Sequence, residues 1–217
     1  MGHRHLPLLV VLALALLPAG AAAQRVTLDV TLTPDTLVNG RQMRLPKVRT
    51  RDLLAGRWGQ ALRNSLPLRL QFEIEIWQSR EGWIDRYERS VEWGVVIRHE
   101  ALFDQYTVTL PQARGAQEVT LPTWEALERY LDREILILSR PASRGTYYYH
   151  VTLVITTLSE ADLDDLERFV RGEEVGGAGR ERERETSGRG TIRFLLRMTG
   201  GLPSETVERR TEKFVVR

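Results

Sequence analysis

Two glutamates on a strongly alternating segment are the residues of this sequence whose types and spacing could do chemistry. In LRLQFEIEIW, residues 68–77, every second side chain is apolar, and the face between them carries Glu73 and Glu75. On a strand that rises ~3.3 Å per residue, their Cα atoms would lie about 6.6 Å apart. This spacing is within the range of the paired carboxylates of inverting glycosidases, in which one acts as general acid and the other as general base.

The neighbouring strand favours a different interpretation of this pair. Catalytic carboxylates flank the scissile bond from opposite sides and need environments that separate their pKa values, whereas two neighbours on one face of a strand point the same way. A strand is expected over 83–98, and in-phase pairing around a loop at 79–82 predicts these partners: Glu75 with Arg86, Arg69 with Glu92, Gln71 with Ser90, Glu73 with Glu88, Trp77 with Ile84, and Gln78 with Trp83. Opposite charges across strands are typical of a wet sheet face, so we interpret the glutamates as solvated.

Histidine and cysteine provide few further candidates for catalytic or metal-binding residues. The sequence contains no cysteine, which excludes thiol chemistry and thiolate metal sites, and His99 and His150 are the histidines outside the N-terminal segment. Neither lies near a nucleophile, phosphate-binding or zinc motif. The alternative is a metal site formed by the two histidines and a carboxylate. We interpret both histidines as surface residues. The sequence therefore predicts no catalytic residue, no cofactor and no metal.

An aromatic surface is the remaining candidate site. Alternation along residues 147–157 directs Tyr147 and Tyr149 to the core and Tyr148 outward. Trp77 is anomalous, because it places a large apolar ring on the face that should be wet. We therefore predict that Trp77, Ile84 and Tyr148 form a surface that contacts a partner.

The N-terminus resembles a secretory signal peptide. Residues 1–23 combine a short n-region containing Arg4, a run of 12 apolar residues over 6–17, and the small-residue string that ends at Ala23. We predict cleavage between Ala23 and Gln24. A run of this length is shorter than the ~20 residues of a transmembrane helix, and no other segment reaches that length. We expect an exported protein, in the periplasm first and outside the cell as the alternative.

Charge excludes one class of partner. Removal of Arg4 with the signal leaves 30 basic against 29 acidic residues, so the mature chain is close to neutral. This balance gives no electrostatic case for nucleic-acid binding.

Hydrophobic periodicity predicts a mainly β protein. Apolar alternation predicts strands, and Asn39-Gly40 predicts a type I′ hairpin turn. Besides 68–77 and 83–98, strands are expected at 26–32, 36–45 (a hairpin), 106–110, 147–157, 192–198 and 206–216, and helices at 51–64, 123–138 and 159–171. This order favours an antiparallel β-sandwich, Ig-like or similar, with two or three peripheral helices, and an open α+β antiparallel sheet is the alternative.

One domain is expected over residues 24–217. Within it, residues 172–190 combine glycine with dense charge, including RERERE at 180–185, and are predicted to form a disordered loop because they offer no apolar surface to bury.

Four segments carry a resemblance to a known family. They are LPLRLQFEIEIWQSREGWID, RHEALFDQYTV, LPTWEALERYL and TYYYHV, in this order. Their order and spacing over residues 26–170 resemble the bacterial family called domain of unknown function 4390. Members commonly end in a tryptophan-containing segment, whereas this sequence has no tryptophan after Trp124. The resemblance implies an exported protein without established activity, and the position of some members near sensor histidine kinase genes implies envelope sensing.

Three functional hypotheses follow. The first is a non-enzymatic envelope protein that binds another envelope protein as an assembly or sensing accessory. The second is a carrier of an apolar or lipid ligand held between sheet and helices. The third is a hydrolase that uses scattered carboxylates.

Overall fold

A computed structural model describes residues 25–111, 116–159, 162–164 and 204–217. The predicted signal with its Ala23–Gln24 junction, the 172–190 loop and the expected strand at 192–198 lie outside these residues. So does most of the helix expected at 159–171. The start of that helix is described, and Ser159 and Asp162 form a capping box there: the Ser159 amide donates to Asp162 Oδ2 at 2.9 Å, and the Asp162 amide donates to Ser159 Oγ at 3.3 Å.

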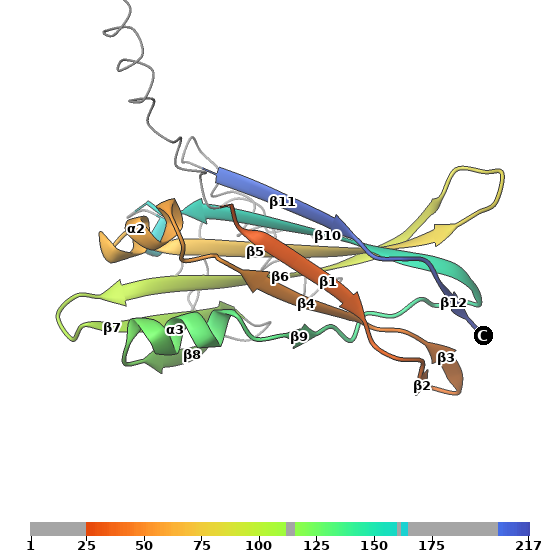
Figure 1. Ribbon diagram of the computed structural model, residues 1–217, viewed down its shortest axis with the longest axis horizontal. Helices are drawn as coiled ribbons and strands as arrows, with labels where there is room; N and C mark the ends of the chain where they lie inside the picture. Colours follow the sequence, from red (N-terminus) through yellow and green to blue (C-terminus); the bar gives the residue numbers. More distant parts are fainter. Residues whose placement is uncertain (1–24, 112–115, 160–161, 165–203) are drawn as a thin grey trace, which may run out of the picture.

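The described chain is built mainly from antiparallel strands (Figure 1). The helices are α2 (Arg57–Arg63) and α3 (Trp124–Leu131). The strands are β1 (Thr27–Leu32), β2 (Thr36–Val38), β3 (Arg41–Met43), β4 (Pro46–Arg51), β5 (Leu68–Ser79), β6 (Arg86–Glu100), β7 (Gln105–Pro111), β8 (Ala116–Leu121), β9 (Ile135–Leu136), β10 (Gly145–Thr157), β11 (Ser204–Arg210) and β12 (Phe214–Val216).

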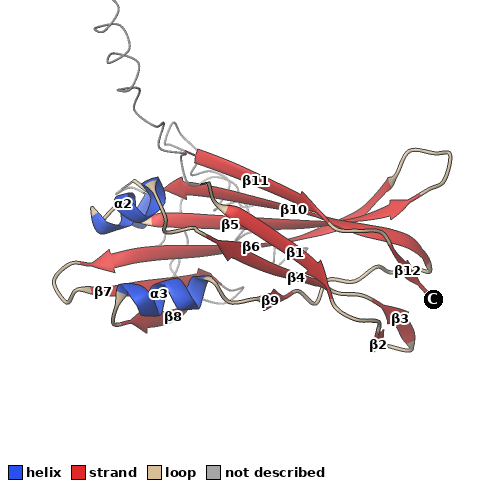
Figure 2. Cartoon of the chain, in the orientation of Figure 1, coloured by secondary structure: helices blue, strands red, loops and turns tan. Residues whose placement is uncertain are grey.

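Two sheets enclose the core. The larger sheet has the order β11-β10-β5-β6-β7-β8, with β12 also paired to β10, and the smaller has the order β1-β4-β9. Figure 1 shows β1 and β4 lying across the larger sheet. The alternating apolar residues of β5 and β10 all face this interior, as predicted, and are buried: Leu68, Leu70, Phe72, Ile74, Ile76, Tyr147, Tyr149, Val151, Leu153 and Ile155. The mainly β, antiparallel fold class is confirmed, with helices at its periphery (Figure 2).

The predicted hairpin turn is present between β2 and β3. Asn39 and Gly40 have φ values of 49° and 73°, which a type I′ turn requires at both central positions. The short β2–β3 sheet therefore follows directly from the sequence.

Both described helices are shorter than predicted because neighbouring residues pair as strands. Residues 46–51 form β4 against β1, and Asp52 and Gly56 then have positive φ values of 56° and 80°, so α2 begins at Arg57 and not at Arg51. Helix α3 begins as predicted, with Thr123 Oγ1 accepting a hydrogen bond of 3.2 Å from the Ala126 amide. It ends at Leu131 and not at Leu138, because the chain then extends as β9 and pairs with β4.

Two strand predictions were also wrong in detail. The sequence pattern did not predict β8, which pairs with β7. The last expected strand, 206–216, is two strands, β11 and β12, which pair in succession along the same edge of β10.

The predicted register between β5 and β6 was wrong by four residues over most of its length. Glu75 faces Ser90 and Glu73 faces Glu92, so the predicted Arg86 and Glu88 are not their partners. A bulge between Ile76 and Trp77 then sets Trp77 opposite Tyr87, and not opposite Ile84. As a result, Tyr87 lies with Trp77 on the outer face of the sheet.

The length of the hairpin loop explains this error. Apolar alternation restricts the register to every second value, but the turn decides between those values. The loop spans residues 80–85, where the Arg80 amide donates to Asp85 Oδ1 at 3.2 Å and the Trp83 amide donates to the Arg80 carbonyl at 3.3 Å. Because these bonds close a longer loop than the expected 79–82, every pair shifts.

Candidate functional site

Strands β5, β10 and β6 gather three aromatic rings on the outer face of the larger sheet. Trp77 lies directly opposite Tyr148 on β10, and their rings are parallel with centroids 6.5 Å apart. On the other side, Tyr87 presents its ring edge-on to Trp77 at 5.5 Å. Aromatic pairs in these geometries stabilise one another beyond the area they bury. We call Trp77, Tyr87 and Tyr148 the outer aromatic cluster.

Charged groups hold Tyr148 in place. Its hydroxyl donates a hydrogen bond of 3.0 Å to Asp85 Oδ2, and the guanidinium of Arg210 lies 3.4 Å from its ring centroid. Arg210 also approaches Asp85 Oδ2 at 3.6 Å. The Arg80 amide and the Tyr148 hydroxyl hold the pKa of the Asp85 carboxyl below its ordinary value. Burial, followed by the bond to Asp85, raises the pKa of Tyr148.

Glu75 has two partners on the same face. The Trp77 indole donates to Glu75 Oε2 at 3.0 Å, and His150 Nδ1 lies 3.0 Å from the same oxygen. The other nitrogen of His150, Nε2, lies 3.6 Å from Glu208 on β11. The carboxylate that sequence spacing offered as half of a catalytic pair is thus held by an indole and an imidazole. A hollow of about 410 Å³ opens here, lined by Trp77, Tyr148, His150, Glu208, Arg209 and Arg210.

Glu73, the other member of the spaced pair, lies among different groups. It faces Glu92 across β5 and β6, and burial together with the Glu73 charge raises the pKa of Glu92. Gln71 Nε2 donates to Glu92 at 3.4 Å. The predicted opposite-charge pairs, Glu75 with Arg86 and Arg69 with Glu92, do not form, because Glu75 faces Ser90 and Arg69 faces Val96. Glu73 meets a like charge, as predicted, but this charge is Glu92 and not Glu88.

The structure does not bring the two histidines together. Glu75 pairs with His150 of β10 on one side and with Ser90 of β6 on the other, so Ser90 lies level with His150. His99 lies nine residues farther along β6, which is about 30 Å. His99 Nε2 instead lies 3.2 Å from Asp104 Oδ1. Within the described ranges, no three acidic or histidine side chains are grouped so that they could hold a metal ion.

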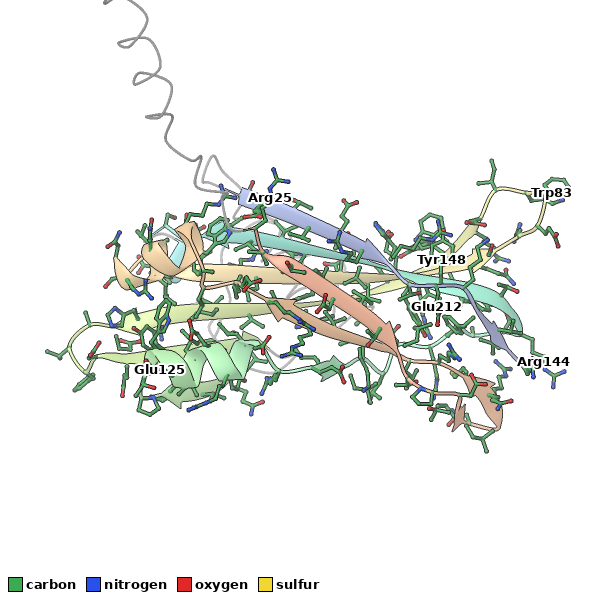
Figure 3. The ribbon with its side chains drawn as sticks, in the orientation of Figure 1. Arg25, Trp83, Glu125, Arg144, Tyr148 and Glu212 are labelled. Atoms are coloured by element: carbon green, nitrogen blue, oxygen red, sulfur yellow. The ribbon has the colours of Figure 1, made fainter. Side chains whose placement is uncertain are left out.

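The three residues of the predicted contact surface lie in two places. Trp77 and Tyr148 are together in the outer aromatic cluster, where Tyr148 is only 7% exposed. Ile84 lies at the tip of the β5–β6 hairpin, 91% exposed beside Trp83, which is 81% exposed. Figure 3 shows Trp83 at the end of this projecting hairpin and Tyr148 on the body of the sheet. Asp85, which the sequence pattern did not indicate, connects the two places.

A second hollow lies between the two sheets. A cavity of about 240 Å³ is lined mainly by apolar side chains, among them Leu70, Phe72, Trp93, Leu110, Ile135 and Ile137. Phe72 and Trp93, a cross-strand pair, stack at 4.6 Å on its wall. Tyr130 and Arg133 also line it, at the junction of α3 and β9. Sequence periodicity gave no signal for this cavity, because its walls come from segments scattered from β4 to β9.

The fold and these surfaces define an antiparallel, two-layered β protein with an aromatic outer face and an apolar cavity between its layers. The family model described as "Domain of unknown function (DUF4390)" matches residues 48–159, more than half of the chain, and the protein belongs to this family. No curated protein and no solved structure matches the chain significantly. In the part of the chain that the structure describes, no helix is both long and apolar enough to cross a membrane.

Proposed function

We propose that the protein is an exported, non-enzymatic component of the cell envelope that binds another envelope protein through the β5–β6 hairpin. The observation that carries this proposal is the exposure of Trp83 and Ile84 at the hairpin tip. Adjacent large apolar side chains in water are unfavourable for an isolated protein and are typical of binding surfaces. Tryptophan is also among the residues that contribute most energy to protein interfaces.

The attachment of the hairpin to the sheet supports this proposal. Asp85 accepts hydrogen bonds from the Arg80 amide and the Tyr148 hydroxyl, so the base of the loop is fixed to β10 while its tip points away. Figure 1 shows the hairpin extending beyond the rest of the molecule. A tip held in this way loses less conformational freedom on binding than a flexible loop would.

Site-specific photocrosslinking in cells tests this function. The chain supplies a matched control: Leu102 and Phe103 form another exposed apolar pair, 87% and 70% exposed, in the β6–β7 turn at the opposite end of the sheet (Figure 1). A photoreactive residue at position 83 is expected to give one discrete adduct in the exported fraction, which Ile84→Ser weakens. The same residue at position 103 is expected to give none. Equal adducts from both positions, or none from position 83, would refute the proposal.

A second candidate function, binding of an apolar ligand, is favoured by the cavity between the sheets. Ligand sites are typically concave, mostly apolar, and contain few polar groups that orient the ligand. The 240 Å³ cavity has this composition, with Tyr130 and Arg133 as its polar groups besides Thr50.

A further inference from the structure

The cavity of about 240 Å³ between the two sheets has a positive charge at its edge, and this charge distinguishes the cavity from a packing defect. Arg133 lines the cavity and is exposed to solvent. Its Nη2 donates to the Tyr130 hydroxyl at 2.9 Å, and its guanidinium lies 3.8 Å from the centroid of the Tyr130 ring. These two contacts orient the guanidinium but leave most of its five N–H donors available.

The acidic residues that flank Arg133 are paired with other cations. Asp132 is bound by Arg49, whose Nε donates to Asp132 Oδ1 at 3.0 Å. Glu134 forms an ion pair with Lys47. Arg133 itself has no carboxylate within ion-pair distance among the described residues. A positive charge without a counter-charge therefore lies at the edge of an apolar cavity.

We propose that this cavity binds the hydrocarbon chain of a medium-chain carboxylate and that Arg133 binds its carboxylate group. This inference rests on the second candidate function and is independent of hairpin docking. A guanidinium presents its donors in a planar fork that matches a carboxylate. A methylene fills about as much space as a water molecule, roughly 30 Å³, so a cavity of 240 Å³ accommodates a chain of about eight carbons.

Calorimetric titration with three probes that share an eight-carbon chain separates the roles of chain and head group. Octanoate is expected to bind the purified chain in a saturable manner, octanol more weakly, and octyltrimethylammonium weakest of all. Arg133→Gln should weaken octanoate binding about tenfold and leave octanol binding unchanged, since a charge-assisted hydrogen bond is lost. Arg129→Gln, in the last turn of α3 but not lining this cavity, should change neither. Circular dichroism of each variant establishes that it is folded.

Fluorescence tests whether the chain occupies this cavity. Trp93 lines the cavity, so bromine on the terminal carbon of octanoate should quench its emission. Trp93→Phe should abolish the saturable part of the quenching while retaining binding. Quenching that is unchanged in Trp93→Phe would overturn the proposed location.

The outcomes separate two kinds of failure. Equal binding of octanoate and octanol, unaffected by Arg133→Gln, would overturn the assignment of a carboxylate ligand while leaving apolar binding in place. The absence of saturable binding of all three probes would overturn both the inference and the candidate function on which it rests.

Discussion

The hydroxyl of Tyr148 donates a hydrogen bond of 3.0 Å to Asp85 Oδ2, and this bond connects the central strand β10 to the loop that carries Trp83 and Ile84. Asp85 uses its other oxygen, Oδ1, to accept from the Arg80 amide within the same loop. One carboxylate thus shapes the loop and attaches it to the sheet. The exposed tip and the outer aromatic cluster are therefore expected to respond together to substitution.

Tyr148→Phe should loosen the hairpin without disturbing the sheet. The ring and its stacking on Trp77 are retained, while the bond to Asp85 is lost. We expect faster tryptic cleavage after Arg80 and Arg86 and an unchanged far-ultraviolet circular dichroism spectrum. Asp85→Asn should accelerate the same cleavage. The double variant should be cleaved no faster than the quicker single variant, because both substitutions disrupt the same hydrogen bond between Tyr148 and Asp85. Additive acceleration would show that the residues act independently.

Glu92→Gln should stabilise the protein at neutral pH. Burial and the opposed Glu73 raise the pKa of Glu92, so the folded state holds this proton more tightly than the unfolded chain does. The resulting stability is full below the unfolded pKa of about 4.3 and is lost as pH rises through the raised folded pKa. After solvent screening, we expect a gain of a few tenths to about 1 kcal/mol in the free energy of unfolding at pH 7.

Urea denaturation at two pH values measures this effect. Little difference between Glu92→Gln and the unsubstituted chain is expected at pH 3, where the carboxyl is protonated in both states. Glu81→Gln, in the exposed hairpin loop, is the control and should change stability at neither pH. A loss of stability at pH 7 in Glu92→Gln would contradict the like-charge interpretation.

Gly59→Ala should destabilise the protein, although alanine is normally the better helix former by about 1 kcal/mol. Gly59 lies inside α2, and an added Cβ would lie 1.9 Å from the carbonyl oxygen of Leu54. The backbone has to move, and we expect a cost of about 1–3 kcal/mol in the free energy of unfolding. Thermal denaturation measures this cost. Gln60→Ala, at the exposed neighbouring position, is the control and should be nearly neutral.

Arg69→Met should leave stability unchanged or increase it. Arg69 lies on the outer face of β5 but is buried, and burial lowers the pKa of its guanidinium to about 10. Below that pH the folded state holds a poorly solvated charge, and a buried charge is often replaced by an apolar side chain without loss. Its Nε has no hydrogen-bond partner among the described residues. A large loss of stability in chemical denaturation would show that the charge is needed, and the exposed Arg209→Met is the control.

The sequence pattern predicted which side chains face the core better than which residues pair. Alternation alone placed Leu70, Ile74 and Val151 correctly, because a strand has two faces and one of them excludes water. The β5–β6 register depended on Asp85, whose bonds to the loop leave no trace in hydrophobic periodicity. Likewise, residues 132–138 have helical spacing, but Ile135–Leu136 extend as β9, because tertiary pairing with β4 overrides local propensity.

The candidate sites differ in the same way. Trp77 was recognisable as an apolar ring on a polar face, and Tyr148 followed from alternation along β10. Arg133 and Tyr130 were not, since a cavity edge is formed only when α3, β9 and the sheet meet in space. A basic residue flanked by two acidic ones reads as a paired charge in sequence, and the structure shows that both acids have other partners.

The pairing of β11 and β12 with β10 has a further consequence for solubility. These two strands lie after residue 159, where the family match ends, yet they cover the backbone donors and acceptors along one side of β10. A fragment limited to the matched residues would present the tyrosine- and valine-rich β10 as an open edge. Such edges recruit strands from other molecules, so the C-terminal strands protect the larger sheet from self-association.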